Sequence, residues 1–235
     1  MDRGLRPTDV AAAGRLARRL TRDDESCLIV HFMGEVTTRF LADATAAWCL
    51  GMGLRVRVVE AGFDQVVQGA VRVAPGGAVV LVPGVDRVGA LETWQTAWAL
   101  TGGSRVVQIG WDTPTVGPVG AHASTAQGPV AQTRAANQAL RASLPTGAWF
   151  VDAARVAGDE GRRHFYDPRQ QHWAGQPWSP AGVSAMARHV AAGLRGLVLG
   201  PRKVLVLDLD NTLWGGIVGE LGGRDHQDDG AEHAA

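Results

Sequence analysis

Six short apolar runs, separated by longer stretches with helical patterns, constrain the fold of this 235-residue chain more than any other feature. The runs are rich in Val, Ile and Leu and are continuous rather than alternating, which is typical of strands buried on both faces. They cover residues 27–32, 54–60, 78–82, 104–109, 148–151 and 203–209. Stretches long enough for a helix lie between them, at 37–50, 88–100, 130–143 and 180–199. This alternation predicts an α/β fold in which helices cover both faces of a parallel sheet.

The predicted helix at 180–199 carries the clearest end signals. Ser179 can cap its first turn, and Pro180 occupies the first helical position. Gly200-Pro201 follows its end, as is common after a helix. This helix should therefore begin and end at these residues.

A further helix is predicted at 7–22, before the first strand. Leu16 and Leu20 fall on one side of it, and arginines surround them. We interpret this segment as a solvated helical arm, with a docking surface for a partner as the alternative.

One connection, residues 110–129, is unusually long and consists mostly of turn-forming residues. It follows the carboxyl end of a predicted strand, where ligands bind in open parallel sheets. Long loops in compact domains are often lids or binding loops. Asp112 and His122 are therefore candidate site residues, with a solvated loop as the alternative.

The charge pattern excludes several classes of partner. The chain has 23 basic and 23 acidic residues and no basic block, so we expect no nucleic-acid binding, which needs one-sided positive charge. No run approaches the ~18 apolar residues of a membrane helix. The first residues also lack the apolar core of a signal peptide. We therefore expect a cytoplasmic protein that does not bind a membrane.

The strongest chemical signal is Asp208-x-Asp210-x-Thr212, at the end of the last apolar run. Residues two apart on a strand point to the same side, so both carboxylates can face one pocket. Two carboxylates so close repel unless a cation lies between them, and Mg²⁺ favours one or two carboxylates together with phosphate oxygens. The pattern suits phosphoryl transfer, in which one Asp attacks phosphorus and the other protonates the leaving oxygen. A structural strand end with two solvated carboxylates is the alternative.

The stretch 203–216 resembles motif I of the haloacid dehalogenase (HAD) superfamily of aspartate-nucleophile phosphatases. The longer string Leu-Asp-Leu-Asp-Asn-Thr-Leu-Trp-Gly-Gly-Ile-Val-Gly-Glu, at 207–220, resembles one branch of it, the FkbH-like proteins of polyketide biosynthesis. Upstream segments resemble the N-terminal region of that branch in the same order, namely 34–41, 59–65, 137–140, 166–169 and 178–180. The resemblance spans residues 25–220.

This resemblance implies a specific activity. FkbH-like proteins take a glyceryl unit from a phosphorylated glycerate, remove phosphate and deliver the acyl group to an acyl carrier protein, as a starter or as the precursor of a methoxymalonyl extender. On the matching positions, Asp208 would be the nucleophile and a Mg²⁺ ligand. Asp210 would be the general acid/base and would contribute its backbone carbonyl to the metal. Thr212 would orient this loop, and Thr212 and Asn211 are the candidate substrate-binding residues.

The N-terminal half of that family resembles the SGNH, or GDSL-like, hydrolase fold, a three-layer α/β/α arrangement like that of flavodoxin. Here Val36 stands where the Ser nucleophile belongs, and Val85 stands where an oxyanion-hole Asn would stand. His172 follows Asp167 by five residues, whereas the hydrolase pattern has three. We interpret this domain as hydrolase-shaped but not a hydrolase, with carrier-protein binding as its role. A thioesterase or esterase activity would rest on fold analogy alone.

The end of the chain departs from the HAD pattern. A phosphatase of this superfamily also needs a Ser or Thr donor, a Lys or Arg that neutralises phosphate, and further acidic residues, all from segments after motif I. Only 19 residues follow Gly216, and 221–235 is polar without apolar periodicity. The single lysine, Lys203, precedes motif I. We therefore expect a chain truncated just after motif I and inactive by itself.

These interpretations divide the chain into a helical arm (1–24), an SGNH-like domain (25–200), the start of a HAD-like domain with motif I (201–220) and a disordered polar tail (221–235). Two functional hypotheses stay open. One is an FkbH-like enzyme of glyceryl transfer and dephosphorylation. The other is a non-catalytic α/β binding module that docks a carrier protein or a partner subunit. The two cysteines, Cys27 and Cys49, fit a reducing compartment, and neither falls in a matched motif that would make it a thioester carrier.

Overall fold

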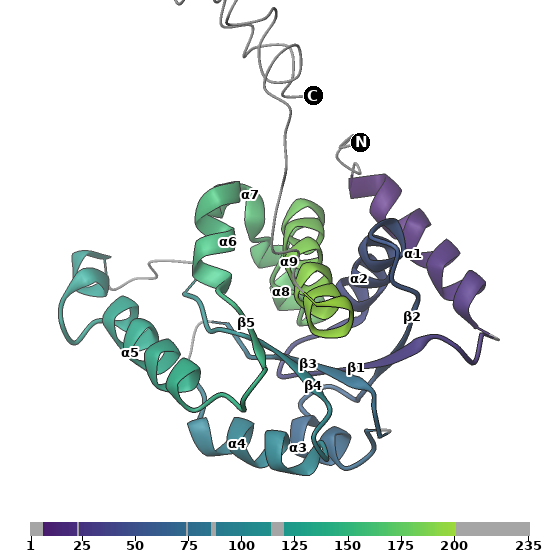
Figure 1. Cartoon of the computed structure of the whole chain (residues 1–235). Coiled ribbons are helices and arrows are strands. Elements are labelled where there is room, and N and C mark those ends of the chain that lie inside the picture. Colours follow the sequence, from purple (N-terminus) through teal and green to yellow (C-terminus); the bar gives the residue numbers. More distant parts are fainter. Residues whose placement is uncertain (1–6, 23, 74, 86–87, 114–119, 201–235) are drawn as a thin grey trace, which may run out of the picture. The chain divides into compact units, whose positions relative to one another are not determined.

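The computed structural model describes residues 7–200 of the chain, apart from 23, 74, 86–87 and 114–119 (Figure 1). These residues belong to one compact unit, Leu5–Gly200. Within them, five strands form one parallel sheet in the order β2-β1-β3-β4-β5. The strands are β1 (Leu28–Gly34), β2 (Val56–Glu60), β3 (Ala78–Val82), β4 (Arg105–Ile109) and β5 (Trp149–Val151). The predicted run at 203–209 lies outside the described residues.

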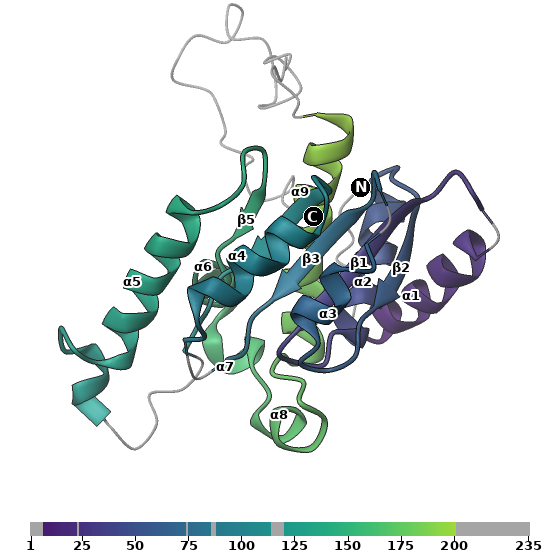
Figure 2. The same ribbon diagram turned by 90° about the horizontal axis from the view of Figure 1, so that it is seen from below.

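Helices cover both faces of the sheet (Figures 1 and 2). One face carries α1 (Pro7–Thr21), α2 (Arg39–Gly51), α6 (Ala153–Glu160), α7 (Arg162–Phe165) and α9 (Pro180–Leu199). The other carries α3 (Val66–Ala70), α4 (Leu91–Leu100) and α5 (Pro129–Ala142). The predicted three-layer α/β architecture with a parallel sheet is confirmed.

The central strand β3 explains why the apolar runs are continuous. Its five residues are all buried. Val80 and Val82 pack in the core on the α2 and α9 side, whereas Val79 and Leu81 pack with Trp94 of α4 on the other side. Because helices cover both faces, neither side of the strand can carry polar side chains.

The helix α9 has the ends that its sequence predicts. The Ser179 hydroxyl accepts a hydrogen bond from the Gly182 N–H at 3.1 Å, and Pro180 is the first helical residue. Gly200 follows the last helical residue with a φ of 77°, a left-handed value that favours glycine. No helix in the described ranges is long and apolar enough to span a membrane.

The helix α1 forms as predicted, but its interpretation as a solvated arm is wrong. It packs on α2 through small residues, and a Cβ atom added to Gly14 would lie 2.8 Å from the backbone oxygen of Asp43. Arg18 of α1 forms ion pairs with Asp43 and with Glu60. Leu16, on the side that the sequence marks as apolar, is half exposed. Close backbone approach through small residues, rather than leucine burial, therefore holds α1 in place.

Candidate functional site

The sheet order identifies the edge at which a ligand would bind. The chain runs from β1 outward to β2 and then returns to β3 on the other side of β1, so the connections diverge between β1 and β3. In open parallel sheets, ligands bind at the carboxyl ends of strands near such a point. At this edge, groups that can form hydrogen bonds follow four of the strands. They are the carboxylates of Glu35 after β1, Asp112 after β4 and Asp152 after β5, and the backbone N–H of Gly84 after β3.

The Glu35 carboxylate lies at the point where the connections diverge, between the ends of β1 and β3. Glu35 is half-buried, and its Oε2 accepts a hydrogen bond from the backbone N–H of Gly84 at 2.7 Å. Its other oxygen, Oε1, lies 3.2 Å from the position that a Cβ atom on Gly89 would take. The next residue, Val36, is buried and apolar. Glu35 and Val36 thus provide no hydroxyl nucleophile, and Glu35 already engages a backbone donor of the kind that an oxyanion hole uses.

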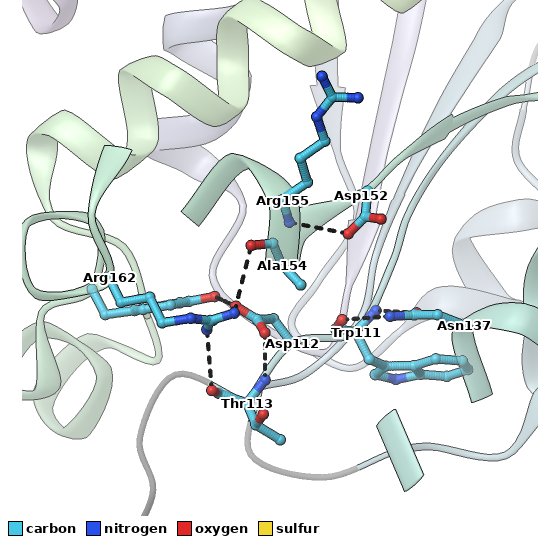
Figure 3. Close-up of polar contacts among 9 residues, drawn as sticks. Trp111, Asp112, Thr113, Asn137, Asp152, Ala154, Arg155 and Arg162 are labelled. Atoms are coloured by element: carbon cyan, nitrogen blue, oxygen red, sulfur yellow. Dashed lines mark hydrogen bonds and ion pairs between the residues drawn. The ribbon is translucent and has the colours of Figure 1, made fainter. Parts of the chain in front are cut away.

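A side-chain clamp holds the chain where it leaves β4. The Oδ1 atom of Asn137, from α5, accepts a hydrogen bond from the backbone N–H of Trp111 at 2.9 Å. Its Nδ2 atom donates to the carbonyl oxygen of Trp111 at 2.8 Å (Figure 3). The Trp111 ring is buried and packs edge-on against Trp94, with ring centroids 6.1 Å apart. These contacts fix the position of the following residue, Asp112.

Asp112 lies at the strand end, as the sequence predicts, but it is not solvated. Its side chain is 3% exposed, and Oδ2 accepts hydrogen bonds from Arg162 Nη1 at 2.7 Å and from the Tyr166 hydroxyl at 2.5 Å. Its Oδ1 accepts the backbone N–H of Thr113 at 2.9 Å (Figure 3). Burial lowers the pKa of Arg162. The hydrogen bond to Asp112 and the negative charge of Asp112 raise this pKa by more than burial lowers it, so the net shift is upward. Asp112 therefore serves as an anchor that ties the end of β4 to α7.

The second candidate in this loop, His122, is not brought to Asp112. It lies in a short 3₁₀ helix, Gly120–Ser124, and its side chain is exposed. Its Nδ1 atom is 3.3 Å from the hydroxyl of Thr125. No hydrogen bond or ion pair joins it to Asp112 within the described residues. The two residues do not form a pair for acid–base chemistry.

Asp167, one of the two residues that a hydrolase would use near the last helix, has a structural role. The Asp167 side chain accepts the backbone N–H groups of Arg169 and Gln170, at 3.0 and 3.2 Å, and so caps α8 (Pro168–Ala174). His172 is exposed on that helix. Val36 follows β1 and has no hydroxyl group, so these three positions do not supply the side chains of a Ser-His-Asp arrangement.

Both cysteines are unsuited to carry a thioester. Cys27 and Cys49 are buried and free. Burial raises the pKa of Cys49 to about 12. Burial, together with a hydrogen bond to Asp24, also raises the pKa of Cys27. Because the thiolate is the nucleophile, neither side chain is activated at neutral pH.

An arginine-lined cleft beside this anchor was not predicted from the sequence. It has a volume of about 600 Å³ and opens between α5 and the segment that follows β5. Its lining residues are Arg134, Asn137, Gln138, Arg141, Asp152, Ala154, Arg155 and Arg162. The signal in the sequence is the helical spacing of the four α5 residues, at i, i+3, i+4 and i+7, which places polar side chains on one face. The other wall is contributed by residues further along the chain, so only the fold reveals the cleft.

The predicted magnesium site stays a prediction. Asp208, Asp210, Asn211 and Thr212 lie outside the described residues. Within residues 7–200, apart from the gaps named above, no group of three or more His, Cys, Asp or Glu side chains could hold a metal ion.

Comparison with known proteins supports the fold. The chain matches no protein-family model and no curated protein. Among solved structures it is similar to the N-terminal part of the protein BF1531 from Bacteroides fragilis, a crystal structure that contains a phosphatase domain and is complexed with Mg. The TM-score is 0.64 at 18% sequence identity, and the match covers 91% of this chain. This chain spans 64% of the length of that fragment, and at this identity the likeness shows the α/β fold alone.

Proposed function

We propose that this chain is an FkbH-like protein of the HAD superfamily, which loads a glyceryl unit from a phosphorylated glycerate onto an acyl carrier protein with removal of phosphate. One observation carries the proposal. The described domain has the fold of a fragment that contains a phosphatase domain and binds Mg. In this chain, the same domain leads directly into the Asp208-x-Asp210-x-Thr212 sequence.

Dephosphorylation would use the carboxylates of that sequence. The Asp208 carboxylate attacks phosphorus in line, the bond from phosphorus to the glyceryl oxygen breaks, and Asp210 protonates the leaving oxygen. Water then hydrolyses the aspartyl phosphate, which restores Asp208 and releases inorganic phosphate. Mg²⁺, held by Asp208 and Asp210, would offset the negative charge on the phosphoryl oxygens. Asn211 and Thr212 would orient the substrate and this loop.

Acyl transfer would use the thiol of the carrier protein. If the glyceryl carboxyl group is an acyl phosphate, the carrier sulfur attacks the carbonyl carbon, a carbon–sulfur bond forms, and phosphate leaves with the electrons of the carbon–oxygen bond. The thiol proton passes to solvent. The raised pKa values of Cys27 and Cys49 support a direct transfer, because neither can serve as an intermediate acyl carrier at neutral pH.

A second candidate is a non-catalytic α/β module that docks a carrier protein or a partner subunit. It is favoured by the edge of the sheet, where Val36 replaces a nucleophile and Glu35 engages the Gly84 donor. Lys203, the single lysine of these 235 residues, precedes Asp208, so these residues offer no lysine after the proposed nucleophile to neutralise phosphate. We therefore expect the 235-residue polypeptide by itself to turn over little phosphate ester.

The nucleophile can be tested without turnover. Beryllofluoride with Mg²⁺ mimics a phosphoryl group on an aspartate, so it should raise the melting temperature of the purified chain. Asp208→Asn should abolish this increase, whereas Asp229→Asn, a matched acidic position in the polar segment, should retain it. Equal responses of the two variants, or no response of the wild-type chain, would refute the proposed nucleophile.

Carrier loading needs its own measurement. The acyl carrier protein that bears its phosphopantetheine arm, with the terminal thiol free, is mixed with the chain, Mg²⁺ and the doubly phosphorylated glycerate, and the mass of the carrier protein is followed. A mass increase equal to one glyceryl group, absent with Asp208→Asn, supports the enzyme. Carrier binding in a titration without any mass increase supports the docking module.

A further inference from the structure

Three large aromatic side chains are exposed on one part of the surface. They are Trp173 of α8, Phe63 in the loop between β2 and α3, and Phe40 in the first turn of α2, with exposed fractions of 82%, 63% and 49%. Single apolar residues are normal on a protein surface, whereas a group of large rings marks an interaction site. The α8 helix supports this interpretation, because it projects from the body of the domain and none of its residues is buried (Figure 2).

The segments that carry the rings meet at Gly175, the residue that follows α8. The Thr37 N–H donates to the carbonyl oxygen of Gly175 at 2.9 Å. A Cβ atom on Gly175 would lie 3.2 Å from the edge of the Phe63 ring and 3.3 Å from the Thr37 hydroxyl. Trp173 is two residues before this point, and Phe40 is three residues after Thr37. The three rings therefore belong to one region, which we call the aromatic patch.

The backbone beneath the aromatic patch is held in place. The Asp64 N–H donates to the carbonyl oxygen of Gly34 at 3.0 Å, which ties the loop of Phe63 to the end of β1. Asp167 caps the start of α8, and Gly175 follows its end with a φ of 60°. Rings on a fixed backbone lose little conformational entropy when a partner covers them, so the patch is suited to binding.

The charged side chains around the aromatic patch have both signs. Arg39 precedes Phe40, Asp64 follows Phe63, and Arg169 lies on α8; all three charged side chains are exposed. None of them forms an ion pair with the residues that the structure describes. A partner with one sign of charge would leave the other sign unmatched. A second copy of this chain, turned about a twofold axis, presents the same mixture, so the arginines of each copy can face the aspartate of the other.

The rings are large enough to form much of a dimer interface. At roughly 200 Å² for a fully exposed ring, their exposed fractions correspond to about 400 Å² in each copy. Two copies would therefore remove about 800 Å² of ring surface from water, before the surrounding side chains are included. Specific interfaces bury about 1,200–2,000 Å² in total, so the rings alone supply about two-thirds of the lower value.

We infer that two copies of this chain associate through the aromatic patch in a twofold-symmetric dimer. The patch of each copy faces the same patch of the other, so each ring is buried twice in the dimer. Tryptophan is enriched among the residues that carry most of the binding energy, so Trp173, the most exposed of the three rings, should contribute most. The inference goes beyond the proposed function, because the dimer requires neither Asp208 nor Mg²⁺.

The test is sedimentation velocity of the whole chain over a range of concentrations. The wild-type chain should shift from 24.8 kDa toward twice that mass, with half of it dimeric at about 10 µM. Trp173→Ala and Phe63→Ala should each raise the dissociation constant by about tenfold or more. Leu100→Ala is the control, because Leu100 is an exposed apolar residue at the end of α4, near the opposite edge of the sheet, and it should change the constant less than twofold. Circular dichroism confirms that each variant is folded.

The symmetry of the dimer gives a second measurement. A labelled wild-type chain is titrated with unlabelled Trp173→Ala chain, and the mixed dimer is followed by fluorescence. A twofold contact contains Trp173 twice, so the mixed dimer should show about half of the variant's effect on a logarithmic scale. If the variant homodimer is about tenfold weaker than the wild type, the mixed dimer should be about threefold weaker.

Several results would overturn the inference. They are a wild-type chain that stays monomeric at about 200 µM, a dimer that Trp173→Ala and Phe63→Ala leave unchanged, an equal effect of Leu100→Ala, or a mixed dimer as weak as the variant homodimer. A monomeric chain that binds an acyl carrier protein with an affinity that depends on Trp173 would overturn the dimer but support the docking module. Asp208→Asn should dimerise as the wild type does, so the dimer stands even if beryllofluoride has no effect.

Discussion

Replacement of Arg162 by methionine tests whether the Asp112 anchor holds the end of β4 to α7. The substitution keeps much of the apolar stem but leaves a carboxylate, 3% exposed, with only the Tyr166 hydroxyl and the Thr113 N–H as partners among the contacts described above. Removal of one partner from a fully buried ion pair costs about 3–5 kcal/mol. The Arg162 side chain is 42% exposed, so water already screens part of the interaction. We therefore expect a loss of about 2–3 kcal/mol in the free energy of unfolding.

The assay is urea denaturation at neutral pH, followed by tryptophan fluorescence and circular dichroism. The midpoint should fall with no change in the slope, because the surface exposed on unfolding stays the same. In a thermal scan, a loss of this size lowers the melting temperature by about 4–12 °C for a domain of this length. Arg163→Met is the matched control, because the neighbouring Arg163 is exposed, and it should change stability by less than about 0.5 kcal/mol.

A double variant separates the ion pair from simple loss of packing. Asp112→Asn combined with Arg162→Met removes both charges, so no uncompensated carboxylate remains. Its loss of stability should be smaller than the sum of the two single losses, by about 1 kcal/mol or more. Additive losses, or equal losses in the Arg162 and Arg163 variants, would refute the reasoning.

Three further predictions follow from buried or half-buried residues. Gly182→Ala should destabilise the domain by about 1–3 kcal/mol or more in urea denaturation, because the new Cβ would lie 2.1 Å from the backbone oxygen of Phe165; a wild-type midpoint would contradict this. Burial lowers the pKa of His31, so its contribution to stability is complete above its ordinary pKa of about 6.5 and is lost as the pH falls below that value. Melting temperatures between pH 7 and 5 should therefore fall less in His31→Leu than in the wild type, and parallel curves would exclude this role. Burial raises the pKa of Cys49 to about 12, so this thiol should react with a thiol reagent at pH 8 only after the chain unfolds. Mass spectrometry of the labelled chain counts the thiols that have reacted. Rapid labelling of Cys49 in the native chain would contradict the prediction.

The sheet and its last helix could be predicted because their signals are local. Continuous apolar runs such as 78–82 mark strands covered on both faces, and Ser179 marks a helix start within one turn. The packing of α1 could not be predicted in this way. Its contact depends on Gly14 meeting the backbone at Asp43, and a glycine in a helix gives no sign of what lies against it.

The candidate site was predicted in part. The position of Asp112 at a strand end follows from the pattern, but its partners Arg162 and Tyr166 are 50 and 54 residues further along the chain, so its burial does not. Likewise, the sequence shows that Val36 stands where a nucleophile would be. The hydrogen bond from the Gly84 N–H to Glu35 could not be predicted in this way, because it joins the ends of two strands, β1 and β3, that are neighbours only in the folded sheet. Long-range contacts of this kind arise from tertiary packing, which periodicity and spacing do not report.

The Asn137 clamp has a consequence for how the arginine-lined cleft can respond to a ligand. Asn137 lines the cleft and also holds both backbone polar groups of Trp111, at 2.9 and 2.8 Å. Any displacement of the α5 wall at this level must therefore break two hydrogen bonds next to a buried ring. The α5 wall is therefore stiff at this level. A molecule that entered the cleft would meet a preformed surface, so binding would require little conformational change and would cost little conformational entropy.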